Sequence, residues 1–173
     1  MIALHLGAGG QRIPPDICGP EYEQTAIDLV QPADIICDVR CLPFENDYAD
    51  MVYSAHLLEH LPEHETVAAL REWRRVLKPG GQLIVRVPDA QAACKQAAEH
   101  GVDCVLYQSA VGPIRAQDVL FGFQPMVRTS EHMAHKVAFD HPKLGRATIA
   151  AGFAKATVLV GRNEYELECI ATK

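Results

Sequence analysis

The chain has 173 residues, of which 49% are hydrophobic and 22% are charged, and its formal net charge is -6 at pH 7. These values are ordinary for a soluble globular protein and predict one domain with a substantial core. The acidic balance disfavours a nucleic-acid partner, which usually requires a basic surface, and no apolar run is long enough to span a membrane.

The six cysteines are scattered and form no C-x-x-C pair, which disfavours a zinc ribbon. The apolar residues 1–10 have no charged segment before them and no cleavage-like site after them, so they do not resemble a signal peptide. We therefore expect reduced thiols and a cytoplasmic location.

Residues 2–6 are apolar and predict a strand that runs into the turn Gly7-Ala8-Gly9-Gly10. A glycine turn after a strand lets the backbone approach a ligand closely and offers amides to an anion. It is not the dinucleotide fingerprint G-x-G-x-x-G, because Arg12 stands where the third glycine is needed. A nicotinamide cofactor is therefore disfavoured.

Residues 11–24 contain three prolines, which argues against a long helix there. Two short strands follow, at 25–30 and 34–37, and each has an aspartate near its carboxyl end, Asp28 and Asp38. The first connections between strands are therefore shortened.

Residues 50–89 predict a complete strand–helix–strand unit. A buried strand at 51–54 precedes a helix that begins near Pro62 and is stopped by Pro79-Gly80-Gly81, and a second strand follows at 83–87. A crossover of this length makes the two strands parallel neighbours, and ligands of such sheets bind beyond the carboxyl ends of the strands.

The last third of the chain contains predicted helices and strands on both sides of an irregular segment at 101–140, and one short helix within that segment. The expected elements are helices at 90–100, 115–121 and 142–151 and strands at 156–160 and 165–171. We expect an α/β fold in one domain of residues 1–173: a doubly wound, mostly parallel, seven-stranded, Rossmann-like sheet that ends in an antiparallel C-terminal hairpin. Long irregular segments in compact domains are often functional, so we expect residues 101–140 on the substrate side.

Three blocks in this order carry a family resemblance: LHLGAGG, CDVRCLPFENDYADMVYSAHLLEHL and LREWRRVLKPGGQLIVRVPD. They resemble the class I S-adenosylmethionine-dependent methyltransferases, and the whole chain is most similar to their small type 11-like subgroup. Two positions depart from the family pattern, because His5 replaces the usual acidic residue and Gln11 replaces a glycine. The chain also begins at its first strand, without the N-terminal helices that cover the substrate in many relatives.

The resemblance implies S-adenosylmethionine as cofactor and assigns contacts to it. The turn Gly7-Ala8-Gly9 would lie against the methionine end, and Asp28 would accept hydrogen bonds from the ribose hydroxyls. The adenine contacts would come from the Asp38 carboxylate, the Val39 amide and the Leu42 side chain. Ser54 and His56 would border the methionine moiety.

The segment HLLEH matches the inverted zinc-protease signature H-x-x-E-H, so a zinc hydrolase is an alternative. Pro62 would interrupt the helix that this motif needs, and the methyltransferase match is longer, so we expect no metal.

A hydroxyl or amine acceptor would benefit from a general base. The candidates are His56 and His60 after the strand at 51–54, and His132 and His135 in the irregular segment. Of these, His60, His56 and His135 are our expected catalytic residues.

We expect a methyltransferase that acts on a small molecule. The remaining alternative is a non-catalytic relative that keeps the fold as a binding module. A second subunit that closes the open substrate side would make the protein a homodimer.

Overall fold

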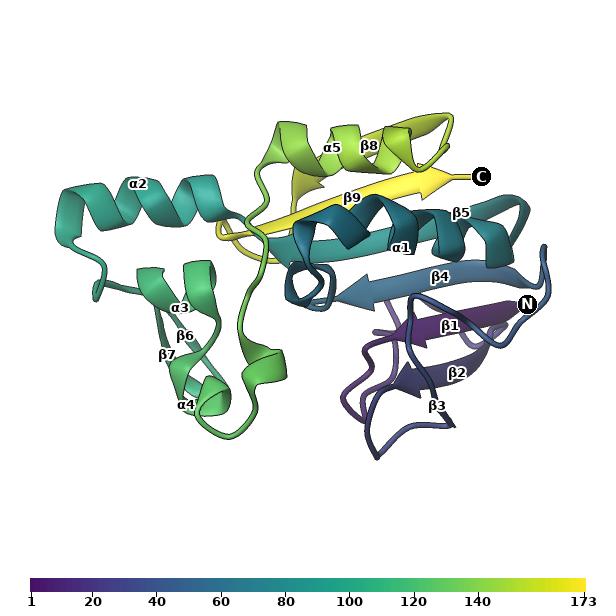
Figure 1. The fold of residues 1–173 in the computed structure, drawn as a ribbon, viewed down its shortest axis with the longest axis horizontal. Helices are drawn as coiled ribbons and strands as arrows, with labels where there is room; N and C mark the ends of the chain where they lie inside the picture. Colours follow the sequence, from purple (N-terminus) through teal and green to yellow (C-terminus); the bar gives the residue numbers. More distant parts are fainter.

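A seven-stranded sheet runs through the computed structural model, which describes residues 1–173 (Figure 1). Its strand order is β3-β2-β1-β4-β5-β9-β8, and β9 alone runs opposite to the other six strands. The strands are β1 (Ile2–Leu6), β2 (Glu23–Asp28), β3 (Ile35–Ile36), β4 (Ala49–Ala55), β5 (Leu77–Pro88), β8 (Lys155–Val160) and β9 (Glu166–Thr172). The expected fold class and the C-terminal hairpin are confirmed.

Strand β5 begins earlier than the sequence predicts. Leu77 already pairs with Ala49, and the register then shifts before Gln82 pairs with Met51. The expected helix stop, Pro79-Gly80-Gly81, therefore lies inside a bulged strand, and Gly80 has the positive φ of 80° that this bend uses. The preceding helix ends at Val76.

Helices α1 (Glu63–Val76) and α5 (His141–Ala150) cover one face of the sheet (Figure 1). Helix α1 places Leu70, Trp73 and Val76 against the sheet with no exposed surface. Its first turn carries Glu63 and Glu65 and its last turn carries arginines, which complements the helix dipole. Together with the strands, these helices enclose the main core of 25 buried residues.

The opposite face of the sheet has no helix packed on it. A smaller cluster there joins Met51, Tyr53 and Ile84 from the strands to Ile13 and Cys18 from the segment after β1. The expected proline-containing loop therefore takes the place of a helix after β1, and it leaves part of this face open.

Helix α2 (Ala90–His100) leads away from the sheet to a smaller unit beyond the strand ends (Figure 1). The Asp89 carboxylate caps this helix by accepting from the amides of Gln91 and Ala92. The unit contains β6 (Val105–Ser109), β7 (Gly112–Arg115), α3 (Ala116–Phe121), α4 (Gln124–Val127) and a short 3-10 helix, η2 (Glu131–Met133).

The two-stranded sheet β6–β7 corrects the expectation that residues 101–140 hold only a short helix. Its strands are short, and a proline lies within β7, so the alternation that marks a strand was weak. Ala93, Ile114 and Val119 form a separate apolar cluster that joins the unit to α2. The expected helix at 115–121 is confirmed as α3.

No helix in the structure has the length and apolar character needed to cross a membrane. All six cysteines are free in this structure.

Candidate functional site

The residues expected to bind a ligand follow the carboxyl ends of β1, β2, β3 and β4, which point toward the small unit (Figure 1). Because parallel strands end at the same edge of a sheet, these residues gather there although they come from distant parts of the sequence. The site is built from two adjoining cavities at this edge.

The glycine turn and Asp28 form one structural element. The Asp28 carboxylate accepts hydrogen bonds from the amide of Gly9 at 2.8 Å and from the amide of Leu29 at 2.7 Å. Gly7 and Gly9 have φ values of 67° and 54°, in the left-handed region that favours glycine. Asp28 thus fixes the turn in place and remains partly exposed to a ligand.

Asp38 is held by an ion pair next to the end of β3. Arg40 donates to both carboxylate oxygens of Asp38, with its Nε at 2.9 and 3.0 Å, and also pairs with Glu65. The hydrogen bonds from Arg40 are the main reason that the pKa of Asp38 is lowered. This carboxylate is ionised and fixed, as an acceptor for an amino group should be.

Val39, Leu42 and Ser54, which the resemblance assigns to the cofactor, are all buried. The Val39 amide donates no hydrogen bond within the chain, whereas its carbonyl accepts from the Trp73 indole at 2.9 Å. Leu42 is 4% exposed, and Ser54 is fully buried with an unpaired hydroxyl. The Val39 N–H is therefore unpaired, although Val39 is itself only 4% exposed, and neither Leu42 nor Ser54 presents its side chain to a ligand in this structure.

The first cavity has a volume of about 260 Å³ and lies between the glycine turn and the open face of the sheet. Gly7, Ala8, Gly9 and His56 line it together, while Asp28, Asp38, Val39, Leu42 and Ser54 do not.

Sequence reasoning did not single out the basic residues of this cavity, Arg12, Arg86 and Arg162. Arg12 pairs with Asp34 at 2.8 Å and Arg86 with Glu168 at 2.6 Å, whereas Arg162 has only a loose contact at 3.8 Å. Arg162 is therefore the cation most available to an anionic ligand.

His5 closes one side of the first cavity. Its Nδ1 lies 3.1 Å from the Gln11 carbonyl, and its ring meets Tyr53 edge-on at 5.1 Å. Burial lowers the pKa of His5, so the ring is neutral at the position where the family resemblance predicts an acid. Together, His5 and Gln11 hold the segment after β1 against the sheet.

His56 lines both cavities and has an unusual backbone, with φ 52°. Its Nε2 lies 2.9 Å from Glu166 and its Nδ1 lies 3.5 Å from Glu59. Burial alone would lower the pKa of His56, but the two carboxylates outweigh it and raise the pKa to about 10. His56 is thus an imidazolium held between two buried acids, on a backbone in the left-handed region.

The second cavity has a volume of about 160 Å³ and lies between the end of β5 and the small unit. Its walls are largely aromatic and histidine side chains: Tyr107, Phe123, Tyr165, His56, His60 and His135. Tyr107 and Tyr165 stack at 6.0 Å with nearly parallel rings.

His60 and His135 meet at this cavity, with their ring centres 5.0 Å apart. The Nδ1 of His60 bonds the Ala134 carbonyl at 3.1 Å, and the Nδ1 of His135 bonds the Val119 carbonyl at 2.9 Å. Because a carbonyl can only accept, both Nδ1 atoms carry the proton and both Nε2 atoms are free. His132, by contrast, is exposed and outside both cavities.

The segment HLLEH does not form the helix that an inverted zinc protease needs. His56 follows β4 in a left-handed turn, and only Leu58–His60 form a 3-10 helix, η1. His56 and His60 therefore do not share one α-helical face, and the hydrolase alternative loses its main support.

Glu166 is the most important residue that sequence reasoning missed. It begins β9, lies opposite Pro88 and is 5% exposed. A signal was present, because Glu166 and Glu168 alternate with Leu167 and Cys169, and an acid on an otherwise apolar strand needs a partner.

Parts of this chain are similar in sequence to known methyltransferases. A family described as "Methyltransferase domain" matches residues 4–85, which include the glycine turn, His56 and most of β5. A ubiquinone/menaquinone biosynthesis C-methyltransferase, UbiE, of Burkholderia vietnamiensis is 45% identical over 51 residues, which is 30% of this chain and 20% of that protein. An uncharacterized methyltransferase of Schizosaccharomyces pombe is 38% identical over 69 residues, 40% of this chain and 24% of that protein. The chain thus matches only about a quarter or less of these relatives.

Solved structures resemble the chain over nearly its whole length. A 1,6-didemethyltoxoflavin-N1-methyltransferase of Burkholderia thailandensis, solved with S-adenosylhomocysteine and 1,6-didemethyltoxoflavin, has a TM-score of 0.64 at 18% identity, over 99% of this chain and 70% of that one. A SAM-dependent methyltransferase of Aquifex aeolicus has a TM-score of 0.62 at 16% identity, over 99% and 81%. At these identities the likeness establishes the fold.

Proposed function

From the premise that this chain has the fold of the class I S-adenosylmethionine-dependent methyltransferases and a methyltransferase-domain sequence at residues 4–85, we propose that it binds S-adenosylmethionine and transfers the methyl group to a small-molecule acceptor. The observation that carries this proposal is the coincidence of the matched region with the first cavity. The glycine turn, Tyr53 and His56 all lie in the matched region and all line that cavity.

We assign the cofactor contacts as follows. Asp28 accepts from the ribose hydroxyls through oxygens that already order the glycine turn, so it couples ligand binding to the shape of the turn. Asp38 and the free Val39 amide face the adenine. Arg162, whose own ion pair is loose, faces the carboxylate of the methionine end in the first cavity.

The cofactor supplies an activated methyl group on a sulfonium, and the protein must align it with the acceptor and exclude water. His56 is the only histidine that lines both cavities, so we place the transferred methyl near it and the acceptor in the second cavity. Its raised pKa keeps His56 protonated at neutral pH, so it cannot take the acceptor's proton. The free Nε2 atoms of His60 and His135 contact the acceptor, directly or through an ion that they share.

The size and lining of the second cavity support a small, flat acceptor. About 160 Å³ admits a single ring system, and the stacked Tyr107 and Tyr165 offer it a planar wall. The net charge of -6 is consistent with such an acceptor and does not favour a nucleic acid.

The direct test is to incubate the purified protein with S-adenosylmethionine and a panel of small ring compounds that carry hydroxyl, amine or activated carbon. Formation of S-adenosylhomocysteine that depends on one acceptor class supports the proposal. Tight binding of S-adenosylhomocysteine with no turnover on any acceptor would instead favour the non-catalytic binding module.

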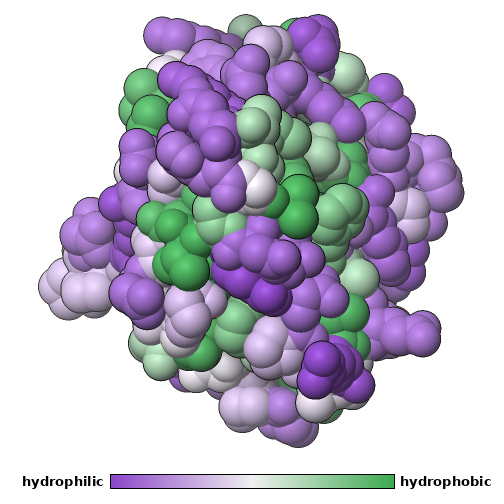
Figure 2. Space-filling view, turned by 90° about the vertical axis from the view of Figure 1, so that its left-hand side faces the viewer, coloured by the Kyte–Doolittle hydropathy of each residue, from purple (hydrophilic) through white to green (hydrophobic).

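The expected cytoplasmic location and homodimer stay predictions. Exposed apolar side chains gather in the small unit, namely Val102, Val105, Val111, Phe121 and Met126. Figure 2 shows apolar patches, in green, among polar side chains on the side of the molecule that carries this unit. A dimer interface there would cover them, and light scattering that finds only monomers would count against it.

A further inference from the structure

We propose that Glu59, His60 and His135 bind a divalent transition-metal ion at the wall of the second cavity, and that the acceptor coordinates this ion through a hydroxyl group. Coordination of the acceptor rests on the proposed function, whereas the metal site rests on the geometry of these three residues.

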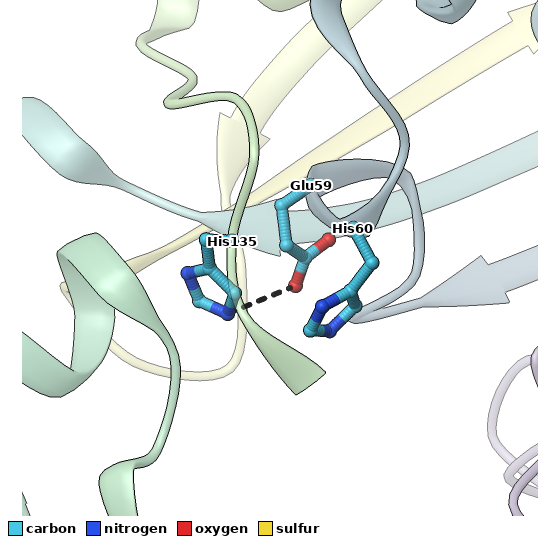
Figure 3. Close-up of side chains that lie close together, drawn as sticks. All are labelled: Glu59, His60 and His135. Carbon is cyan, nitrogen blue, oxygen red and sulfur yellow. Dashed lines mark ion pairs between the residues drawn. The ribbon is translucent and has the colours of Figure 1, made fainter. Parts of the chain in front are cut away.

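The three side chains point toward one another from two separate segments (Figure 3). One donor atom from each can be chosen so that all three lie within 4.8 Å of one another. Four ligands around zinc at 2.0–2.2 Å stand roughly 3.4 Å apart, so side-chain shifts of about 1 Å would close the site.

Each of the two imidazoles already has a backbone partner at its Nδ1. Each donates its Nδ1–H to a backbone carbonyl, His60 to Ala134 and His135 to Val119, which leaves the Nε2 lone pair free. Metal-binding histidines usually have such an outer partner, because it fixes the tautomer and the direction of the ring. The Nε2 of His135 lies 4.0 Å from the Glu59 carboxylate, on the side where an ion would lie.

Glu59 is a buried carboxylate without a hydrogen-bond partner. Its side chain is 1% exposed, and neither carboxylate oxygen has a hydrogen-bond partner. A buried carboxylate without hydrogen bonds is costly, and a cation is the usual compensation. His56 provides only a distant one, at 3.5 Å, and it is shared with Glu166.

The charge balance around Glu59 leaves room for a cation. The local acids are Glu59, Glu166 and Glu168, and the local cations are His56 and Arg86. Three carboxylates thus face one guanidinium and one imidazole. A divalent ion beside Glu59 would pair the carboxylate of this group that has no hydrogen bond.

The backbone holds the site together across the sequence. The amides of Lys136 and Val137 donate to the Glu59 carbonyl at 2.8 and 3.2 Å, and the His135 amide donates to the Phe121 carbonyl at 3.2 Å. The segment that carries His135 is therefore docked on η1, so little reorganisation is needed to bring the three ligands to one ion.

Two imidazoles and one carboxylate suit zinc, cobalt, nickel or ferrous iron better than magnesium or calcium, which prefer oxygen ligands. Three protein ligands also leave coordination positions open to the second cavity. An acceptor that carries a hydroxyl beside a ring would fit both the ion and the aromatic walls.

The methyl group then passes from the sulfonium to the acceptor oxygen. The hydroxyl of the acceptor binds the ion and loses its proton to water, so the oxygen keeps the electron pair of the O–H bond. This pair forms the new O–CH₃ bond while the C–S bond of the sulfonium breaks. The bonding electrons pass to sulfur, which leaves as neutral S-adenosylhomocysteine.

The test uses cobalt alone as the probe. The full chain, freed of metal by chelation, is titrated with Co²⁺ and followed by its visible absorption and by calorimetry, and Zn²⁺ then competes for the site. We expect one equivalent of cobalt, displaced by zinc, and at least a tenfold loss of affinity in His60→Gln and in His135→Gln. His132→Gln is the matched control, because it changes an exposed histidine of the same segment and should keep the wild-type affinity.

Far-ultraviolet circular dichroism checks that each variant is folded, and Glu59→Gln provides a variant of nearly equal size at the third ligand. Failure of the folded wild type to bind either ion would overturn the metal site, as would an equal loss in His132→Gln. S-adenosylhomocysteine is titrated separately into the metal-free protein, so failure of the metal site and failure of the cofactor site are distinguishable.

Discussion

Asp28 is predicted to serve both the shape of the glycine turn and the cofactor, and replacing it with alanine separates the two roles. The substitution removes two short hydrogen bonds, from the amides of Gly9 and Leu29, and a longer one from the Val30 amide at 3.4 Å. At about 1 kcal/mol for each of the two short bonds from partly exposed amides, the loss in unfolding free energy is about 2 kcal/mol. In a domain of this size that lowers the melting temperature by roughly 4–8 °C.

The same substitution should weaken S-adenosylhomocysteine binding by tenfold or more, about 1.4 kcal/mol, because the ribose hydroxyls lose their acceptor. Asp34→Ala is the control. The Asp34 carboxylate accepts from the Ala26 amide at 2.8 Å and from Arg12 at 2.8 Å, so its loss disturbs the same region without touching the expected ribose position.

Calorimetric titration and thermal unfolding of the three proteins give the comparison. We expect Asp34→Ala to be destabilised but to keep its affinity within about threefold, less than 0.7 kcal/mol. Equal affinity losses in both variants would mean that the ligand senses only the shape of the turn. An unchanged affinity in a folded Asp28→Ala protein would refute the assignment.

Three further predictions concern other parts of the structure. Trp73→Phe removes the indole donor to the Val39 carbonyl and part of a fully buried ring, so urea unfolding should show a loss of about 2–3 kcal/mol, and a loss below 0.5 kcal/mol would contradict this packing. Arg162→Met should weaken S-adenosylhomocysteine binding several-fold in calorimetry, most at low salt, and an unchanged affinity would remove Arg162 from the site. The pKa of Asp118 is lowered, because hydrogen bonds from Arg115 and Gln124 outweigh the opposing effect of burial, so this carboxylate stabilises the fold above its ordinary pKa of 3.8 and loses that effect as the pH falls below it. Asp118→Asn should therefore cost about 2 kcal/mol at pH 7 and progressively less below pH 3.8 in urea unfolding, and a difference that does not change with pH would contradict the ion pair.

Local signals in the sequence were enough for most of the main sheet. Strand β1 and helix α2 have the predicted bounds, because a glycine turn ends the first and Asp89 caps the second. The β6–β7 strands were missed since their residues pack on α2, α3 and Tyr165, and that packing cannot be read from a short run of letters. The bulge that moves Leu77 into β5 likewise depends on its pairing with Ala49.

The sequence predicted the glycine turn and the histidines of the candidate site, but it did not predict which residues those histidines contact. His56 meets Glu166 across 110 positions of sequence, through the pairing of β5 with β9. His60 meets His135 because the segment after η2 docks on η1 through backbone bonds. Such contacts follow from the fold as a whole, so no spacing in the sequence indicates them.

The central claim, that this chain binds S-adenosylmethionine at the carboxyl edge of its sheet, is tested most directly by titrating the wild-type protein with S-adenosylhomocysteine in a calorimeter. We predict one site of micromolar affinity, about −8 kcal/mol. Adenosine alone and methionine alone should each bind far more weakly, because each fills only one half of the site. No binding of S-adenosylhomocysteine to folded protein at millimolar concentration would contradict the claim and leave the chain with the fold of a methyltransferase but not its cofactor.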